Sequence, residues 1–361
     1  MQIDLMKRAA IWCALFFVVS MGAILYISKE KVITISDVAQ DEVQKADTNE
    51  DDSDVSDEVK LTQEKNILTF VLGESDTSYL RIPIPEGSKA ENVVVENHYM
   101  DRELWVFIKE GQDIFYAENA ISGNREMIDE GVYEQTEEGV VLKFQLKGIF
   151  EYRTILENND LYVSFLTPRE MYDKIVVIDP ACGGMNLGYL AGEISEKNLN
   201  LGIARKLKDK LDGSGIKAYY TRMDDVNPSE EDRVLLANET KADMYIRIEA
   251  DSKEDTALYG TTALYNGDYF IPGFGSIELA DYLEREVVTN IKGKALGLEE
   301  AGAEEYTLRH VTVPAATIKV GCISNKQEAL LMNREEYQEK IAEGIYQAIL
   351  KVYEENFAEE N

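Results

Sequence analysis

Four side chains in the second half of the sequence carry the chemistry that a hydrolytic or metal-binding site would need. They are Cys182, Glu196, Glu249 and Lys319. A thiolate and carboxylates are ligands that a catalytic zinc ion accepts, and the metal then activates a bound water with the help of a nearby carboxylate base. A protonated lysine is different, because it has no lone pair with which to bind a metal or accept a proton. The set therefore holds three candidate ligands and one cation.

The elements predicted around these residues would bring them to one edge of a sheet. The predicted strands are 174–179, 216–221, 244–249, 261–265 and 316–320, and the predicted helices are 196–211, 228–239, 276–288 and 334–353. Strands that alternate with helices indicate an α/β fold with a mixed or parallel sheet flanked by helices. Ligands of such folds bind outside the carboxyl ends of the strands, so we treat the four residues as one site.

Four short motifs around these residues occur in a recognisable order. Residues 179–184 read Asp-Pro-Ala-Cys-Gly-Gly, 196–201 read Glu-Lys-Asn-Leu-Asn-Leu, 249–251 read Glu-Ala-Asp, and 319–325 read Lys-Val-Gly-Cys-Ile-Ser-Asn. They resemble D-P-G-H-G-G, E-K-x-x-N-L, H-A-N and E-x-G-F-x-S-N of the zinc-dependent N-acetylmuramoyl-L-alanine amidases. These enzymes cut the bond between muramic acid and the first alanine of the peptidoglycan stem peptide. The resemblance covers nearly all of 174–353 and implies an amidase-like domain over 171–356.

The same resemblance implies that the site has been altered. Carried over position by position, the family's three zinc ligands fall on Cys182, Glu196 and Glu249, and its catalytic glutamate falls on Lys319. Only Glu196 keeps the family's residue type. The two histidines of the chain, His98 and His310, do not fall on ligand positions.

Three interpretations of the altered site stay open at this level. In the favoured one Lys319 lies between Glu196 and Glu249 and replaces the zinc electrostatically, because buried carboxylates need a counter-charge. No cofactor is then expected, and the protein would be a non-catalytic binder of peptidoglycan or a regulator of an envelope hydrolase. A second interpretation keeps zinc on unusual ligands and keeps the amidase activity. A third is a structural envelope scaffold whose β domain does the binding. Separately from these three, the alternative to the charge cluster is a pocket that is merely relaxed, with solvated side chains.

Four further residues have weaker claims to a function. Arg222, Arg233 and Asn238 are candidates for substrate binding, although helix–sheet packing or capping is the favoured role for the helical pair Arg233 and Asn238. Cys182 and Cys322 both follow predicted strand ends, and outside the cytoplasm a disulfide between them is chemically allowed. The distance between them cannot be derived from the sequence.

The amino-terminal part of the chain predicts a membrane protein. Residues 9–27 carry no charge and are about as long as a bilayer span requires, and Lys7 and Arg8 precede them. We therefore expect a cytoplasmic segment at 1–8 and a transmembrane helix at 9–28, with a cleaved signal peptide as the alternative. The expected localisation is the cytoplasmic membrane, single-pass, with the folded domains outside the cytoplasm. Residues 29–62 are predicted to be an acidic, disordered linker.

Residues 63–170 are predicted to form a small β-sandwich. The predicted strands are 66–72, 79–84, 92–95, 103–108, 139–146 and 160–166. Many short strands separated by turns are typical of a sandwich. A sandwich ahead of an amidase domain is similar in arrangement to the AMIN module, which targets such enzymes to the cell envelope.

The net charge of −31 argues against nucleic acid as a partner, because phosphate binding needs clustered lysine and arginine.

Overall fold

The structure is a computed structural model that describes residues 66–72, 78–267 and 271–357 of the 361-residue chain. The chain divides into two units at the boundary between Thr62 and Gln63. All described residues belong to the second unit. The predicted cytoplasmic segment, membrane span and acidic linker lie outside the described residues.

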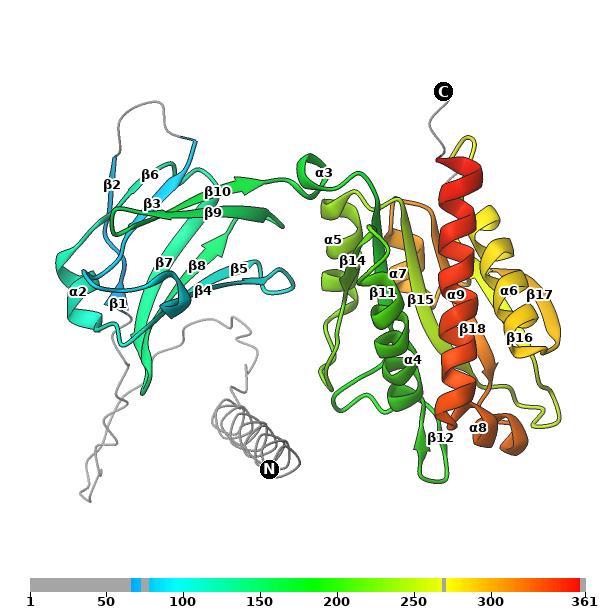
Figure 1. Cartoon of the computed structure of the whole chain (residues 1–361). Helices are drawn as coiled ribbons and strands as arrows, with labels where there is room; N and C mark the ends of the chain where they lie inside the picture. The colour runs from blue at the N-terminus through cyan, green and yellow to red at the C-terminus, as the bar shows by residue number, and fades with distance from the viewer. Residues whose placement is uncertain (1–65, 73–77, 268–270, 358–361) are drawn as a thin grey trace, which may run out of the picture. The chain divides into compact units, whose positions relative to one another are not determined.

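Two five-stranded sheets form the first half of this unit (Figure 1). One has the order β1-β7-β8-β5-β4, with β1 Asn66–Ile67, β7 Ile128–Gln135, β8 Gly139–Leu146, β5 Glu103–Lys109 and β4 Val93–His98. The other has the order β2-β6-β3-β10-β9, with β2 Phe70–Leu72, β6 Ile121–Gly123, β3 Leu80–Pro83, β10 Asp160–Leu166 and β9 Glu151–Glu157. A 3-10 helix, η1 Ala90–Asn92, precedes β4, and the short helix α2 Asp113–Glu118 precedes β6.

One apolar core lies between the two sheets, so the arrangement is a sandwich. Side chains alternate along a strand between the two faces of its sheet. Leu104, Val106 and Ile108 of β5 are buried accordingly, and they share a core with Ile82 of β3 and Val163 of β10.

The second half of the unit is built on a six-stranded mixed sheet with the order β14-β11-β15-β18-β16-β17. The strands are β14 Lys217–Tyr220, β11 Ile175–Pro180, β15 Met244–Asp251, β18 Ala315–Cys322, β16 Thr261–Tyr265 and β17 Ala295–Glu300. The first four are parallel to one another, whereas β16 runs antiparallel to β18 and parallel to β17. Their order explains why the site is at one edge, because the carboxyl ends of β11, β15 and β18 lie side by side.

Helices cover both faces of this sheet. On one face lie α4 Glu196–Leu211, α6 Ser276–Ile291 and α9 Glu335–Asn356, and on the other lie α5 Glu230–Thr240 and α7 Tyr306–His310 (Figure 1). The alternation of β11 accounts for the two layers. Val176 and Ile178 pack into the core beneath α4 and α9, while Ile175 and Val177 pack into the core beneath α5 and α7.

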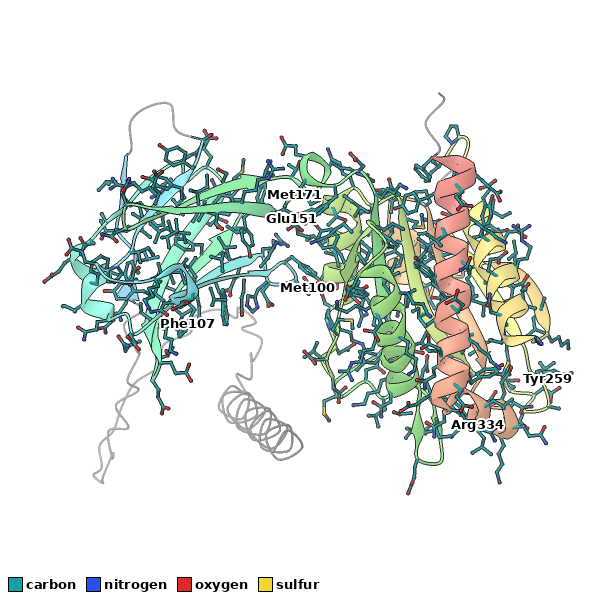
Figure 2. The ribbon with its side chains drawn as sticks, in the orientation of Figure 1. Met100, Phe107, Glu151, Met171, Tyr259 and Arg334 are labelled. Carbon is teal, nitrogen blue, oxygen red and sulfur yellow. The ribbon has the colours of Figure 1, made fainter. Side chains whose placement is uncertain are left out.

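Small elements complete the chain. The helix α3 Pro168–Met171 connects the two halves, the hairpin β12 Leu190–Ala191 and β13 Ile194–Ser195 follows β11, and α8 Lys326–Met332 follows β18. Figure 2 shows Tyr259, which follows β15, and Arg334, which follows α8, toward the same end of the α/β part. This end is the carboxyl edge of the parallel strands.

The prediction of an α/β fold with a mixed sheet flanked by helices is confirmed. The predicted localisation as a single-pass membrane protein is contradicted by the helices that the structure describes. Across residues 66–72, 78–267 and 271–357, none of the helices combines the length and the apolar character needed to cross a bilayer. The apolar run 9–27, which prompted that prediction, is not among these residues.

Candidate functional site

The four residues singled out in the sequence all lie at the carboxyl edge of the mixed sheet. Glu249 and Lys319 are register partners on the neighbouring strands β15 and β18. Glu196 is the first residue of α4, and Cys182 lies two residues beyond the end of β11. Cys182 has a φ of 64°, a conformation that few non-glycine residues adopt and that turns the chain sharply after the strand.

Cys182 and Glu196 lie close together beneath the loop that leads to β12. A Cβ atom placed on Gly188 of that loop would stand 2.5 Å from Oε2 of Glu196 and 2.9 Å from Sγ of Cys182. Gly188 has a φ of 63°, so the absence of a side chain serves both the backbone conformation and the close approach. The backbone N–H of Tyr189 donates to Oε2 of Glu196 at 2.9 Å and fixes that carboxylate.

Arg247 is the cation bound directly to Glu249. Its Nε donates to Oε1 of Glu249 at 2.8 Å, and its Nη1 donates to Oδ2 of Asp179 at 2.8 Å and to Oε2 of Glu230 at 3.2 Å. The side chain is only 11% exposed. Sequence reasoning missed Arg247, although its position two residues before Glu249 on one strand already places both side chains on the same face of the sheet.

Lys319 forms its ion pairs with other acids than the two predicted for it. Its Nζ lies 3.7 Å from Oδ1 of Asp251 and 3.6 Å from Oε1 of Glu305. The predicted arrangement placed Lys319 between Glu196 and Glu249. In the structure two cations pair with these acids instead. Arg247 pairs with Glu249, and Lys319 pairs with Asp251 and Glu305. Glu305 could not be found from the sequence, because it precedes a helix that has no strong pattern of its own.

Burial and the crowding of acids shift the protonation of the site. Burial raises the pKa of Cys182 to about 12, and the charges of Glu196 and Glu249 act in the same direction. Burial also raises the pKa of Glu196 to about 7, with a contribution from Glu249. Burial lowers the pKa of Lys319, but the charges of Glu249, Asp251 and Glu305 outweigh it, and the net shift is upward. At neutral pH the thiol is therefore protonated and the lysine is charged.

A fully buried carboxylate supports the site from below. Asp179 of β11 is bound by Arg233 and Tyr245 and accepts from Oγ1 of Thr221 at 2.5 Å, in addition to Arg247. Burial alone would raise the pKa of Asp179, but the two guanidinium groups lower it to about 2. Arg233 is itself fully buried. It therefore acts as the counter-charge of Asp179 and is not turned toward a ligand.

Arg222 and Asn238 also have internal partners. Arg222 donates to the backbone carbonyls of Pro180 at 2.8 Å and Ala181 at 2.9 Å, so it holds the turn after β11 in place. The amide of Asn238 donates to the carbonyl of His310 at 3.2 Å and accepts from the N–H of Thr312 at 2.8 Å. These contacts are those of packing and capping residues. The prediction that they bind a substrate stays a prediction.

The remaining candidates are the two cysteines and the two histidines. Cys182 and Cys322 are both free thiols. His98 is stacked on Trp105 of the sandwich, and His310 is stacked on Tyr306 at the end of α7. Neither histidine is positioned to replace the ligands that the family would have at residues 182 and 249.

The residues at the three family ligand positions do not fit a zinc ion as they are arranged. Oε2 of Glu249 keeps lone pairs that a metal could use, but Oε1 is held by the guanidinium of Arg247, which is a cation at the ligand position. A dication at Glu249 would stand beside that guanidinium, in a site that also holds the ammonium group of Lys319. Within the part of the chain that the structure describes, no three His, Cys, Asp or Glu side chains are grouped as a metal ion would require.

What this edge can do chemically is bind polar groups. It offers hydrogen-bond donors on Arg247 and Lys319 and acceptors on Glu196 and Glu305. Hydrolysis would need a group that takes a proton from water, and the residue at the family's base position is a charged lysine.

A comparison with protein-family models identifies residues 176–351 as matching the model of the N-acetylmuramoyl-L-alanine amidases. The match spans β11 to α9. It includes all four residues of the site, and it leaves the sandwich outside.

Two curated sequence relatives agree with this match. The germination-specific N-acetylmuramoyl-L-alanine amidase of Bacillus subtilis is 28% identical over 221 residues, which is 57% of this chain and 90% of the relative. The N-acetylmuramoyl-L-alanine amidase CwlM of Mycobacterium tuberculosis is 28% identical over 192 residues, which is 50% of this chain and 45% of the relative. Among solved structures, an N-acetylmuramoyl-L-alanine amidase from Clostridium difficile 630 is 31% identical, with a TM-score of 0.47, and the match covers 50% of this chain and 97% of that one.

Proposed function

Because the chain belongs, through residues 176–351, to the N-acetylmuramoyl-L-alanine amidase family, we propose that it is a member that binds peptidoglycan without cutting it. Fold and activity are separate questions, since the same fold can carry a site that has lost its chemistry. The observation that supports a non-catalytic role is the ion pair between Arg247 and Glu249. It places a cation of the chain on a residue that would otherwise bind the metal.

The substitution at the base position supports the same conclusion. In the metal-dependent reaction a carboxylate takes a proton from the metal-bound water. Lys319 stands at that position with two acidic neighbours that favour its charged form. A charged ammonium group has no acceptor, so it cannot take the proton. Losing the ligand and the base together removes both halves of the mechanism.

A binding role remains chemically reasonable for the same edge. Peptidoglycan stem peptides present carboxylates, amides and ammonium groups, and the site offers partners of both signs. Arg247 and Lys319 can donate to a carboxylate, while Glu305 and Glu196 can accept from an amide or an amine. In α/β folds ligands bind outside the carboxyl ends of the strands, which is where these side chains lie. The likeness of the preceding sandwich to an AMIN module stays a prediction.

The proposal is tested by measuring metal, binding and cleavage on one preparation. The purified protein should contain far less than one zinc per chain by atomic emission, and it should sediment with purified peptidoglycan. It should release no stem peptide from that peptidoglycan, even with added zinc.

Two results would overturn the assignment in different ways. One tightly held zinc per chain that is lost on Cys182→Ala, together with release of stem peptide, would show an active amidase with unusual ligands. Failure to sediment with peptidoglycan would leave a scaffold or a regulator of another hydrolase. The exchange Lys174→Gln is a suitable control, because Lys174 lies at the opposite edge of the sheet, just ahead of β11.

A further inference from the structure

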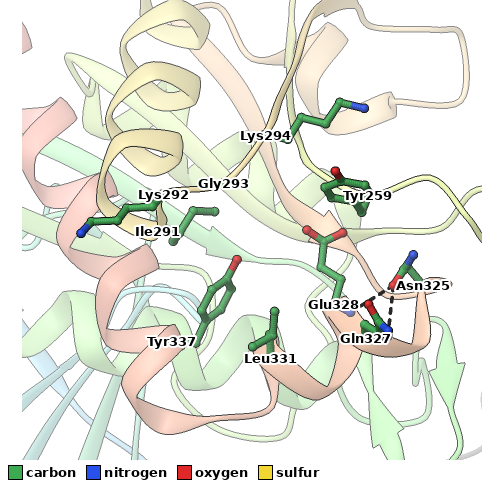
Figure 3. A pocket seen from close by; sticks show the side chains of 10 residues that line it. All are labelled: Tyr259, Ile291, Lys292, Gly293, Lys294, Asn325, Gln327, Glu328, Leu331 and Tyr337. Carbon is green, nitrogen blue, oxygen red and sulfur yellow. Dashed lines mark hydrogen bonds between the residues drawn. The ribbon is translucent and has the colours of Figure 1, made fainter.

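We propose that a pocket of the α/β domain, outside the altered site, binds the carboxylate-bearing end of a short peptide. The pocket lies between the carboxyl end of α6, the loop after β15, and the first turns of α8 and α9 (Figure 3). It encloses about 440 Å³, which is room for a ligand the size of a dipeptide. That the peptide comes from peptidoglycan rests on the proposed function, whereas the chemistry of the pocket does not.

The charge at the mouth of the pocket is the first indication of its ligand. Lys292 and Lys294 flank Gly293 directly after α6, and both line the pocket. Among the residues that the structure describes, neither lysine has an ion pair with a carboxylate, although the whole chain has 68 acidic residues against 37 lysines and arginines. In so acidic a protein, two neighbouring cations without acidic partners favour an anionic ligand.

Ordinary structural roles explain only part of this placement. Lys292 is the left-handed residue that ends α6, and a cation there is favoured by the helix dipole. Lys294 lies beyond the helix, with its Nζ 5.0 Å from the ring centroid of Tyr259. Figure 3 shows the two side chains leading outward on different sides of the hollow. Their long stems let both ammonium groups turn toward a carboxylate at the mouth.

The floor of the pocket offers acceptors for N–H groups. The carboxylate of Glu328 is nearly buried and accepts from the backbone N–H of Cys322 at 2.7 Å and of Gly260 at 3.1 Å. A carboxylate has about four lone-pair positions, so acceptor capacity remains. In Figure 3 the hydroxyl of Tyr337 points into the same hollow. A peptide brings N–H donors to such a floor.

The walls of the pocket are apolar and aromatic. Ile291 and Leu331 line one part of it, and the ring of Tyr259, a residue that is 52% exposed, lines another. Such surfaces suit the methyl groups of small amino-acid side chains. A neutral sugar could stack on Tyr259, but it brings no anionic group to the two lysines. The combination of carboxylate, N–H donors and small apolar side chains is that of a peptide end.

The pocket also adjoins the altered site through one strand. Cys322, whose N–H binds Glu328, ends β18, and Lys319 lies three residues earlier on it. A stem peptide with its first residues at the altered site could therefore place its far end in this pocket.

Three soluble probes test the assignment by calorimetric titration of the whole protein. They are a stem tetrapeptide with a free terminal carboxylate, the same peptide with its carboxylates amidated, and a neutral N-acetylglucosamine disaccharide. The free-carboxylate peptide should bind, and its affinity should fall as salt is added. The amidated peptide and the sugar should bind at least about tenfold more weakly, since a charge-assisted contact is typically worth that factor or more.

The variant that tests the lysines is Lys292→Gln with Lys294→Gln. It should weaken binding of the free-carboxylate peptide about tenfold or more and leave the amidated peptide unaffected. The matched control is Lys241→Gln with Lys174→Gln. Lys241 is also a left-handed residue that ends a helix, and Lys174 also lies over a tyrosine ring, but both are at the opposite edge of the sheet.

The outcomes separate this inference from the proposed function. If the two double variants bind the peptide equally well, the proposed ligand of the pocket is wrong. If both variants still sediment with peptidoglycan, the proposed function is unaffected. Tighter binding of the neutral sugar than of the peptide would also overturn it. If the lysine variant does not fold, backbone amide shifts of Gly260, Cys322 and Leu331 on titration of the unaltered protein decide the question. If these amides do not shift when the peptide is added, the proposal that the pocket binds the peptide is overturned.

Discussion

Arg247 is bound by three carboxylates, and each of them would be left with fewer partners if it were removed. Asp179 is fully buried, Glu249 lies at the carboxyl edge, and Glu230 belongs to the helix that covers the other face. Burying a carboxylate without its counter-charge is costly, because the low dielectric of the interior gives no compensation. One guanidinium therefore serves both the stability of the sheet and the charge balance of the site.

We predict that Arg247→Met destabilises the protein by about 3–5 kcal/mol, since it removes one partner of a buried ionic network. Methionine keeps much of the side-chain volume, so the loss reports charge more than packing. Urea denaturation followed by circular dichroism measures the effect. The control is Arg285→Met, which removes an exposed pair on α6 and should cost about 0.5 kcal/mol or less. A loss below 1 kcal/mol for Arg247→Met would show that the network is not held as described.

The raised pKa of Glu196 makes a prediction with a definite sign. An acid whose pKa rises on folding, here from 4.5 to about 7, costs free energy when it is ionised. The cost is small below pH 4.5, grows as the pH rises toward 7, and is then constant at up to about 3 kcal/mol. Glu196→Gln should therefore raise the melting temperature at pH 8 and change it much less at pH 5.

Thermal unfolding at the two pH values checks this prediction, with the exposed Glu193→Gln as the control for the loss of one surface charge. A bound zinc ion would reverse the outcome. Glu196 would then be a ligand, and its replacement would lower the melting temperature at pH 8.

The sequence was sufficient to find which residues share the site but not how they pair. Cys182, Glu196, Glu249 and Lys319 were selected by their resemblance to the family's motifs and placed at one edge from the order of strands and helices, and the structure shows them at that edge. The partner of each charge depends on side-chain rotamers and on Glu305, which arrives from a segment far along the chain. Those contacts are tertiary, and no local pattern encodes them.

At the scale of elements, regular patterns were readable and weak ones were not. The predicted helix 196–211 and the predicted strands 139–146, 160–166 and 261–265 agree with α4, β8, β10 and β16. The helix has a clear apolar period that matches one buried face, whereas β16 is buried at four consecutive positions and β8 is a mostly apolar run. In contrast, β7 carries Asp, Glu and Gly in its first half, and β17 is only partly buried, so neither shows the apolar run that predicts a strand.

The loop between β11 and α4 offers a test in which only one variable changes. Gly188 and Gly192 both have positive φ, at 63° and 68°. A Cβ on Gly188 would meet Glu196 and Cys182 within 3 Å, whereas a Cβ on Gly192 would meet nothing within 4 Å. Both exchanges to alanine should cost about 1 kcal/mol for the left-handed backbone, and Gly188→Ala should cost about 1–3 kcal/mol more for the clash.

Chemical denaturation of the two variants measures the difference. Equal stabilities would mean that the loop does not lie against Cys182 and Glu196. A larger loss at Gly188 would support the close approach of these two residues, because the backbone penalty is shared by both variants.

At the scale of the molecule, the α/β domain has the mixed sheet and flanking helices of an amidase-like fold, and the resemblance implies that its site differs from the family's at several positions. In such a domain the fold can be kept while metal binding is lost, so the two are tested separately. The sequence comparison alone points to restoring three positions, Cys182→His, Glu249→His and Lys319→Glu. The structure adds a fourth, because Arg247 would stand beside the new ligands after losing Glu249 as its partner.

We predict that the triple variant binds zinc weakly and that adding Arg247→Ser gives a site for about one zinc per chain. Two histidines with the retained Glu196 form a ligand set that catalytic zinc accepts, and removing the guanidinium removes its repulsion of the dication. Titration with zinc chloride after chelator treatment compares the two variants, and a change in melting temperature on adding zinc checks that the metal binds the folded state. Equal zinc affinity in the two variants would show that Arg247 does not oppose the metal. Restored binding without turnover would show that the groups that orient the ligands have changed as well.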